Sequence, residues 1–477
     1  MAEPSRGARA IVLGRSGRAG FALKVALGLL GLALAGCAGH ASRTAEARSA
    51  LDAKNPELAL SLLNEELDVE NAAALPDDLS GDNTLLILDR SMVLQQLAKY
   101  QLSSRDLEIA DKRIEVLDFS RGAVDELGKY LYSDDAGPYK APPYEKLMIN
   151  TMNMVNYLAR GDLGGARIEA RRLAVMQKFI SESESPAEAA LGPGSYLAGF
   201  TFEKSMRYDE ALRFYDEALE HGDYQSLASP VRRLLSKSGY KSPRLRRLVE
   251  AGSSSPTAEE GAQDGETAEE ADGTAESGEI LVIVSFGRVP AKVAERVPIG
   301  LALTYASGAL SPNQVSRANY LAAQGLVTWV NYPELGKPRG QYDRPGFAID
   351  GEWQRLEGAL AVDKLAHTAW DSTKGTIIAA AITRLLARVA AGEVVRQVSG
   401  EGIEGALLSL VTQATLTAAD TPDTRSWATL PARMALGRVR VAPGQHWVHL
   451  EARGKAKRQR VTVKPGGWAV VALTVLG

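Results

Sequence analysis

Apolar residues in the first half of the chain recur every three or four positions, which is the spacing of amphipathic helices. The clearest stretch is "GSYLAGFTFEKSMRYDEALRFYDEALEHGD". This spacing predicts two consecutive helices, and small and aromatic residues recur at fixed positions along them. The positions that carry this pattern are Gly199, Phe202, Ala211, Tyr215 and Ala218.

The spacing of these five residues resembles the tetratricopeptide repeat, a unit of two antiparallel helices. Three further windows fit the same frame: "MNMVNYLARGDLGGARIEARRLA", "LQQLAKYQLSSRDLEIADKRIEVL" and, more weakly, "ARSALDAKNPELALSLLNEEL". The alanines at the expected crossings are 51, 56 and 45 residues apart, against roughly 34 in an ideal repeat, so insertions must separate the units. A generic helical bundle is the alternative. We expect a tetratricopeptide-like α-solenoid over residues 37–250, with a groove that receives a protein partner.

An acidic segment, residues 251–279, separates this half from the next. It contains no aromatic or large aliphatic residue, and it is rich in Glu and Asp. We therefore expect a disordered linker.

The second half changes to short alternating or β-branched runs, which predict strands near residues 280–286, 326–333 and 346–363. Helical periodicity returns over about 361–418, and four more strand-like runs follow between residues 432 and 476. Residues 280–477 are therefore expected to form an antiparallel β-sandwich with a helical insertion, which makes the whole chain α+β.

The N-terminus carries an export signal. Lys24 precedes an uncharged apolar run, Val25 to Ala35, which is too short for a membrane-spanning helix of roughly 20 residues. Leu34-Ala35-Gly36-Cys37 looks like a bacterial lipobox, so residues 1–36 are expected to be a cleaved signal peptide and Cys37 a lipid attachment site. The alternative is an ordinary secretory signal with a chance cysteine. Ala38 follows, rather than the Asp that favours inner-membrane retention, so we expect an outer-membrane anchor facing the periplasm.

The net charge and the cysteine content argue against nucleic-acid binding and against disulfide bonds. Removal of the signal peptide takes away five basic residues and one acidic residue, so the formal net charge falls from −3 to −7. That balance argues against nucleic-acid binding. Cys37 is the only cysteine, so no intrachain disulfide can form.

Few residues suggest chemistry, and we expect a non-enzymatic protein without cofactor or metal. The five histidines are not spaced as shared metal ligands, and the common catalytic and phosphate-binding motifs are absent. The densest polar group lies in "AADTPDTRSWATLPAR": it is either a ligand site, with the tryptophan stacking on a glycan, or a loop held by an Arg–Asp pair. Its members are Asp420, Asp423, Arg425 and Trp427.

A basic stretch, "VRRLLSKSGYKSPRLRRL", closes the helical half. It could meet lipid phosphates or an acidic partner, or it could be a solvated helix face.

The order of these parts resembles an uncharacterised family of bacterial envelope lipoproteins with tetratricopeptide-like repeats and a C-terminal β domain. The segments that carry the resemblance are the lipobox, "PYEKLMINTMNMVNYLARGDLGGARIEARR", "GEILVIVSFGRVP" and "ADTPDTRSWATLP". The resemblance implies a link to small lipoproteins that activate peptidoglycan synthases. The expected function is a protein-binding scaffold in envelope assembly; the alternative is a lipoprotein that binds glycan or peptidoglycan around Trp427 and Arg425.

Overall fold

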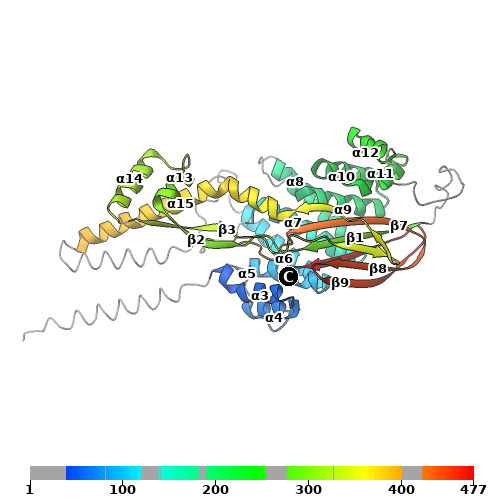
Figure 1. The fold of residues 1–477 in the computed structure, drawn as a ribbon, viewed down its shortest axis with the longest axis horizontal. Coiled ribbons are helices and arrows are strands. Elements are labelled where there is room, and N and C mark those ends of the chain that lie inside the picture. Colours follow the sequence, from blue (N-terminus) through cyan, green and yellow to red (C-terminus); the bar gives the residue numbers. More distant parts are fainter. Residues whose placement is uncertain are drawn as a thin grey trace, which may run out of the picture.

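A computed structural model describes residues 39–80, 82–119, 139, 141–181, 190–253, 277–325, 327–399 and 422–477 (Figure 1). The fold is α+β, 53 % helical and 21 % strand, with helices in the N-terminal part and sheets in the C-terminal part. The acidic linker expected at 251–279 lies largely outside the described residues.

Consecutive helices of the N-terminal part pack against each other in pairs, α3 with α4, α5 with α6, α7 with α8 and α9 with α10. The helices are α2 (His40–Arg43), α3 (Ala45–Asp52), α4 (Pro56–Glu66), α5 (Asn83–Gln96), α6 (Tyr100–Phe119), α7 (Pro143–Ala159), α8 (Leu163–Ser181), α9 (Leu191–Lys204), α10 (Tyr208–His221), α11 (Ala228–Leu235) and α12 (Pro243–Ser253).

One turn geometry joins the two helices of all four pairs. Each first helix is followed by three residues, and the middle one has a positive φ, between 55° and 74°. In the last pair the N–H of Arg207 donates to the carbonyl of Phe202 and that of Met206 to the carbonyl of Glu203, each at 2.9 Å, and the other three turns repeat this pattern. Two such bonds around a left-handed residue cap the carbonyl end of the first helix. The four left-handed residues are Lys54, Ala98, Gly161 and Met206.

Within its described residues, the C-terminal part forms two four-stranded sheets and one two-stranded ribbon. The first sheet has the order β10-β1-β7-β6, the second β5-β4-β8-β9, and the ribbon pairs β2 with β3. The strands are β1 (Gly278–Phe286), β2 (Lys292–Pro298), β3 (Trp329–Leu335), β4 (Gly346–Ile349), β5 (Glu352–Gln354), β6 (Glu357–Ala361), β7 (Arg433–Val441), β8 (Gly444–Ala452), β9 (Lys455–Val463) and β10 (Trp468–Val475).

The first sheet is mixed rather than antiparallel, because β1 and β10 run parallel, with Glu279 opposite Trp468 and Phe286 opposite Val475. The expectation of an all-antiparallel arrangement is therefore wrong at this pairing. β1 occupies the middle of the sheet and all nine of its residues are buried. A strand covered on both faces needs no polar alternation, which explains the continuous apolar run "ILVIV".

The two faces of β1 belong to two different cores. Val282 and Val284 pack with Phe347 and Leu450 between the two four-stranded sheets. Leu281 and Ile283 belong instead to the large core that includes the N-terminal helices. The first sheet therefore lies between the helices and the second sheet, and the apolar core is continuous from the N-terminal helices into the C-terminal part.

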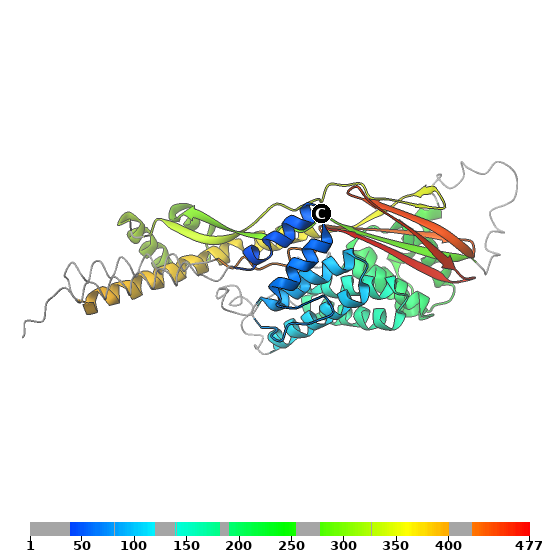
Figure 2. The same cartoon turned by 90° about the horizontal axis from the view of Figure 1, so that it is seen from below.

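An arm extends from one side of this body (Figures 1 and 2). It consists of the β2–β3 ribbon and the helices α13 (Ile299–Tyr305), α14 (Pro312–Ala323) and α15 (Val362–Ser399). These elements share a separate core, which contains Val330, Trp370 and Ile378. The helical insertion expected over 361–418 begins as α15; its second helix lies outside the described residues.

Candidate functional site

The expected lipid attachment site, Cys37, lies outside the described residues, as does Asp420. The first residue that the structure describes is Gly39, two positions after Cys37 and directly before α2. Within the described part of the chain, no helix combines the length and apolar character needed to cross a bilayer.

The five repeat-signature residues build the crossing of α9 and α10. Gly199 faces the ring of Tyr215 so closely that an added Cβ would lie 2.4 Å from a ring carbon. The hydroxyl of Tyr215 donates to Oε2 of Glu203 at 2.6 Å, which fixes the ring in place. Phe202, Ala211, Tyr215 and Ala218 are all buried. These residues hold the hairpin together and offer no exposed surface for a partner.

In three of the four helix pairs, the first helix packs against the chain's own C-terminal part. α5 and α7 pack against β10, and α9 packs against β6. The ring of Phe200 meets Trp468 edge-on, with centroids 5.8 Å apart, and the hydroxyl of Thr474 donates to Gln95 at 3.1 Å. These contacts bury one side of the helices on which we expected a groove for a partner, and the apolar residues of these helices share a core with residues of β1 and β10.

A buried ion network crosses the same boundary. Arg438 on β7 donates to Oε2 of Glu203 at 2.7 Å and to Oε1 of Glu279 at 2.7 Å, and its side chain is 1 % exposed. It also donates to the hydroxyl of Tyr215 at 2.8 Å, and Lys204 pairs with both carboxylates. Burial alone would raise the pKa of Glu203 and Glu279, but the charges of Arg438 and Lys204 lower both pKa values. Both carboxylates therefore remain ionised inside the protein.

The polar loop before β7 is a structural lock. Asp423 accepts from Nε of Arg425 at 2.8 Å and from Nη2 at 2.9 Å, and the side chain of Arg425 is 2 % exposed. Trp427 is fully buried, and its indole N–H donates to the carbonyl of Leu88 on α5 at 3.0 Å. A ligand cannot stack on an indole that has no free face. Of the two alternatives for this loop, the geometry supports the Arg–Asp lock.

The next residues of this loop complete the connection to the N-terminal helices. Asp89 on α5 accepts from the N–H of Thr429 at 3.0 Å and from its hydroxyl at 2.8 Å. Its other oxygen is 2.9 Å from Nε2 of the buried His40. The three side-chain types resemble a hydrolase triad, but the hydroxyl contacts the carboxylate rather than the imidazole, so the histidine cannot act as its base. In the described ranges no group of three or more His, Cys, Asp or Glu side chains is placed to hold a metal ion.

The arm carries the most prominent group of exposed aromatic and aliphatic residues. Trp329 on β3 is 45 % exposed, and the Arg296 guanidinium lies over its ring at 5.3 Å. Lys374 on α15 lies over the ring of Tyr305 at 4.9 Å and pairs with Glu334 at 2.6 Å. The exposed members of this arm surface are Val293, Leu301, Tyr305, Tyr320 and Trp329.

A second exposed aromatic group lies on the outer face of the second sheet. Trp353 on β5 meets His449 on β8 edge-on, with centroids 5.7 Å apart. Trp447 on β8 is 43 % exposed, and the guanidinium of Arg458 lies over its ring at 4.4 Å. The indoles of Trp353 and Trp447 and the guanidinium of Arg458 therefore lie on the same exposed face of the sheet, whereas the indole of Trp427 is buried.

Scans of the chain against protein-family models, curated proteins and solved structures found no match.

Proposed function

We propose that the protein is an outer-membrane lipoprotein, anchored through Cys37 and facing the periplasm, that acts as a non-enzymatic protein-binding scaffold in cell-envelope assembly. The partner is a protein of that machinery, such as one involved in peptidoglycan synthesis. No cofactor takes part. The helical part, tetratricopeptide-like in its pairing, and the sandwich-like sheets form the rigid body that carries the binding surface.

One observation carries this proposal: apolar residues of the arm are exposed, while the first helices of three repeat pairs pack against the protein's own strands. Val293 on β2, Leu301 on α13 and Tyr320 on α14 are between 38 % and 63 % exposed, and all three belong to the arm that extends away from the body (Figure 2). Exposed apolar patches are typical of protein-binding surfaces, and tryptophan and tyrosine contribute much of the energy at such interfaces.

The test has two parts. Metabolic labelling with a palmitate analogue should mark the wild-type protein and leave Cys37→Ser unmarked. An unmarked wild-type protein would contradict the proposed lipid anchor. For the scaffold, the soluble chain 38–477 should capture a defined envelope protein, and the double substitution Tyr320→Ala, Trp329→Ala should abolish capture. Tyr342→Ala, which removes an aromatic residue that is 85 % exposed outside the arm, is the matched control and should capture normally.

A second candidate function is supported by the outer face of the second sheet. Trp447 and Trp353 with Arg458 offer stacking surfaces and a cation, which suit a glycan bearing carboxylates. This replaces the expected site around Trp427. Sedimentation with purified sacculi should be weakened by Trp447→Ala and unaffected by Trp329→Ala, the reverse of the result expected for protein capture.

A further inference from the structure

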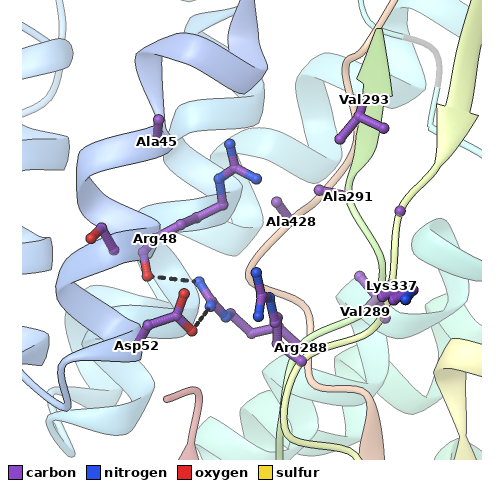
Figure 3. Close-up of a pocket in the computed structure, with 12 residues that line it drawn as sticks. Ala45, Arg48, Asp52, Arg288, Val289, Ala291, Val293, Lys337 and Ala428 are labelled. Atoms are coloured by element: carbon purple, nitrogen blue, oxygen red, sulfur yellow. Dashed lines mark hydrogen bonds and ion pairs between the residues drawn. The ribbon is translucent and has the colours of Figure 1, made fainter. Parts of the chain in front are cut away.

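A cavity of about 490 Å³ opens between α3, the residues that join β1 to β2 and those that follow β3 (Figure 3). Four of its lining side chains are cationic: Arg48 from α3, Arg288 after β1, and Lys337 and Arg339 after β3. Among the described residues that line the cavity, Asp52 carries the single carboxylate. The cavity therefore has an excess of positive charge.

Arg288 is the fixed centre of this cavity. It is 3 % exposed; its Nη1 donates to the carbonyl of Arg48 at 3.2 Å and its Nη2 to Oδ1 of Asp52 at 2.5 Å, as Figure 3 shows. Among the described residues, its buried Nε has no hydrogen-bond partner, nor has the Nε of Arg48. Burial lowers the pKa of Arg288, and although Asp52 opposes this, the charges of Arg48 and Arg339 lower it further. Asp52 alone does not balance the cations around it.

The backbone holds the rim cations beside this centre. The N–H of Arg288 donates to the carbonyl of Arg339 at 2.6 Å, and the N–H of Arg339 donates back at 3.0 Å. Gly287 permits this approach, because its φ is +68° and an added Cβ would lie 2.6 Å from the Arg339 carbonyl oxygen. The side chains of Lys337 and Arg339 are exposed, and no hydrogen bond or ion pair joins them to other described side chains.

We propose that this cationic cavity binds a phosphate group, and that the headgroup of an anionic membrane phospholipid supplies it. Four cations around one cavity, two of them guanidinium groups whose Nε has no partner among the described residues, are the chemistry that recognises phosphate. The choice of a lipid rests on the proposed anchor at Cys37. Ala45, in the cavity wall, follows Cys37 by eight residues, so a chain at full extension places the cavity at most roughly 28 Å from the acylated residue.

The experiment uses the chain 38–477, which keeps every described residue and carries no lipid. Its binding to phosphatidylcholine vesicles with and without phosphatidylglycerol is measured by cosedimentation, and inorganic phosphate is titrated by calorimetry. The double substitution Lys337→Ala, Arg339→Ala should weaken binding to the phosphatidylglycerol vesicles at least about tenfold. Arg246→Ala, Arg247→Ala removes two exposed cations from the basic stretch at the end of the helical part and should change binding less than about twofold.

A third variant, Ser49→Trp, fills the cavity without removing a cation, and it should lower vesicle and phosphate binding as much as the double substitution does. Circular dichroism verifies that each variant is folded. Equal losses in both double variants, or normal binding by Ser49→Trp, would overturn the site, because binding would then follow net charge alone. Phosphate binding that depends on the cavity, without vesicle binding, would overturn the lipid as its source. Either failure leaves palmitate labelling of Cys37 unaffected, so the anchor and the phosphate site are tested separately.

Discussion

At the scale of single residues, the most consequential group is the buried network around Arg438. One guanidinium from β7 satisfies Glu203 of the helical part and Glu279 of the first strand. Because both carboxylates lie in the interior, each depends on this cation for its charge balance. The network therefore fixes how the helices and the sheet are placed relative to each other.

The substitution Arg438→Met tests this role. It keeps much of the side-chain volume but leaves two buried carboxylates with only Lys204 and the more distant Arg233, so we expect a loss of about 3–5 kcal/mol in the free energy of unfolding. Chemical denaturation near neutral pH measures this loss. Arg440→Met, two residues along the same strand and exposed, should stay within about 0.5 kcal/mol of wild type. Similar stabilities of the two variants would mean that the network is not important for the fold.

Glu169 gives the stability a predictable dependence on pH. Burial raises its pKa from 4.5 to about 7, although Asn150 and Arg172 oppose this. Between these two values the folded protein retains a proton that the unfolded chain releases, so stability falls as the pH rises through this range. As the pH rises from about 4.5 to about 8, the free energy of unfolding of Glu169→Gln should increase by on the order of 2–3 kcal/mol relative to that of wild type. Thermal unfolding at several pH values measures the difference, and the exposed Glu65→Gln should show none.

At the scale of elements, the four helix pairs share one left-handed turn residue, and two of these turns allow a reciprocal test. Gly161 has a φ of 74° with open space around its Cβ position, so Gly161→Ala should destabilise by about 1 kcal/mol through backbone strain alone. Ala98, with a φ of 55°, occupies the equivalent position, and Ala98→Gly should keep or raise the stability. Denaturation curves compare the two. A loss in Ala98→Gly equal to that in Gly161→Ala would contradict the shared turn.

The arm has its own core, so its stability should be separable from that of the body. Ile378 on α15 is fully buried within the arm, and Ile378→Ala should lower the local stability by about 2–5 kcal/mol. Hydrogen exchange should then speed up in β2, β3 and α13 while α5 to α10 stay protected. Leu450→Ala, in the core between the sheets, is the control and should instead expose the strands of the body. Faster exchange throughout the molecule after Ile378→Ala would show that the arm is not independent.

The sequence pattern predicted the elements better than their assembly. The four helix-pair windows and the strands β1, β3 and β4 to β10 follow local periodicity, so they were predictable. β2 and the helices α13 and α14 were missed, because exposed positions dominate β2, α13 has only seven residues, and α14 buries only Ala318 and Leu321. The local signals for α14 were a capping box at Ser311 and Gln314 and a proline, Pro312, at its first position.

The candidate surfaces were less predictable, because they depend on contacts between distant residues. Nothing local in "GRVRV" indicates that Arg438 reaches Glu203, 235 residues away. For the same reason, the sequence pattern did not indicate that the protein's own sheet packs against α5, α7 and α9, and it did not decide between the two alternatives for the loop around Trp427. Local patterns indicate which faces are apolar but not what covers them.

At the scale of the whole molecule, the N-terminal helices, the first sheet and the second sheet are layers of one body with continuous apolar packing. The chain's proposed anchor precedes α2, and the arm extends from the body with its aromatic residues exposed. This arrangement suits a scaffold that is held at a membrane and presents one binding element.

Site-specific photo-crosslinking in cells tests the central claim, that the arm is the partner-binding surface. A crosslinking residue is placed at Tyr320 or Trp329 on the arm, and at Ile168 or Val175 on α8, which are 54 % and 72 % exposed. We expect a discrete crosslinked protein from both arm positions and none from α8. A discrete product from α8 with no product from the arm would contradict the account.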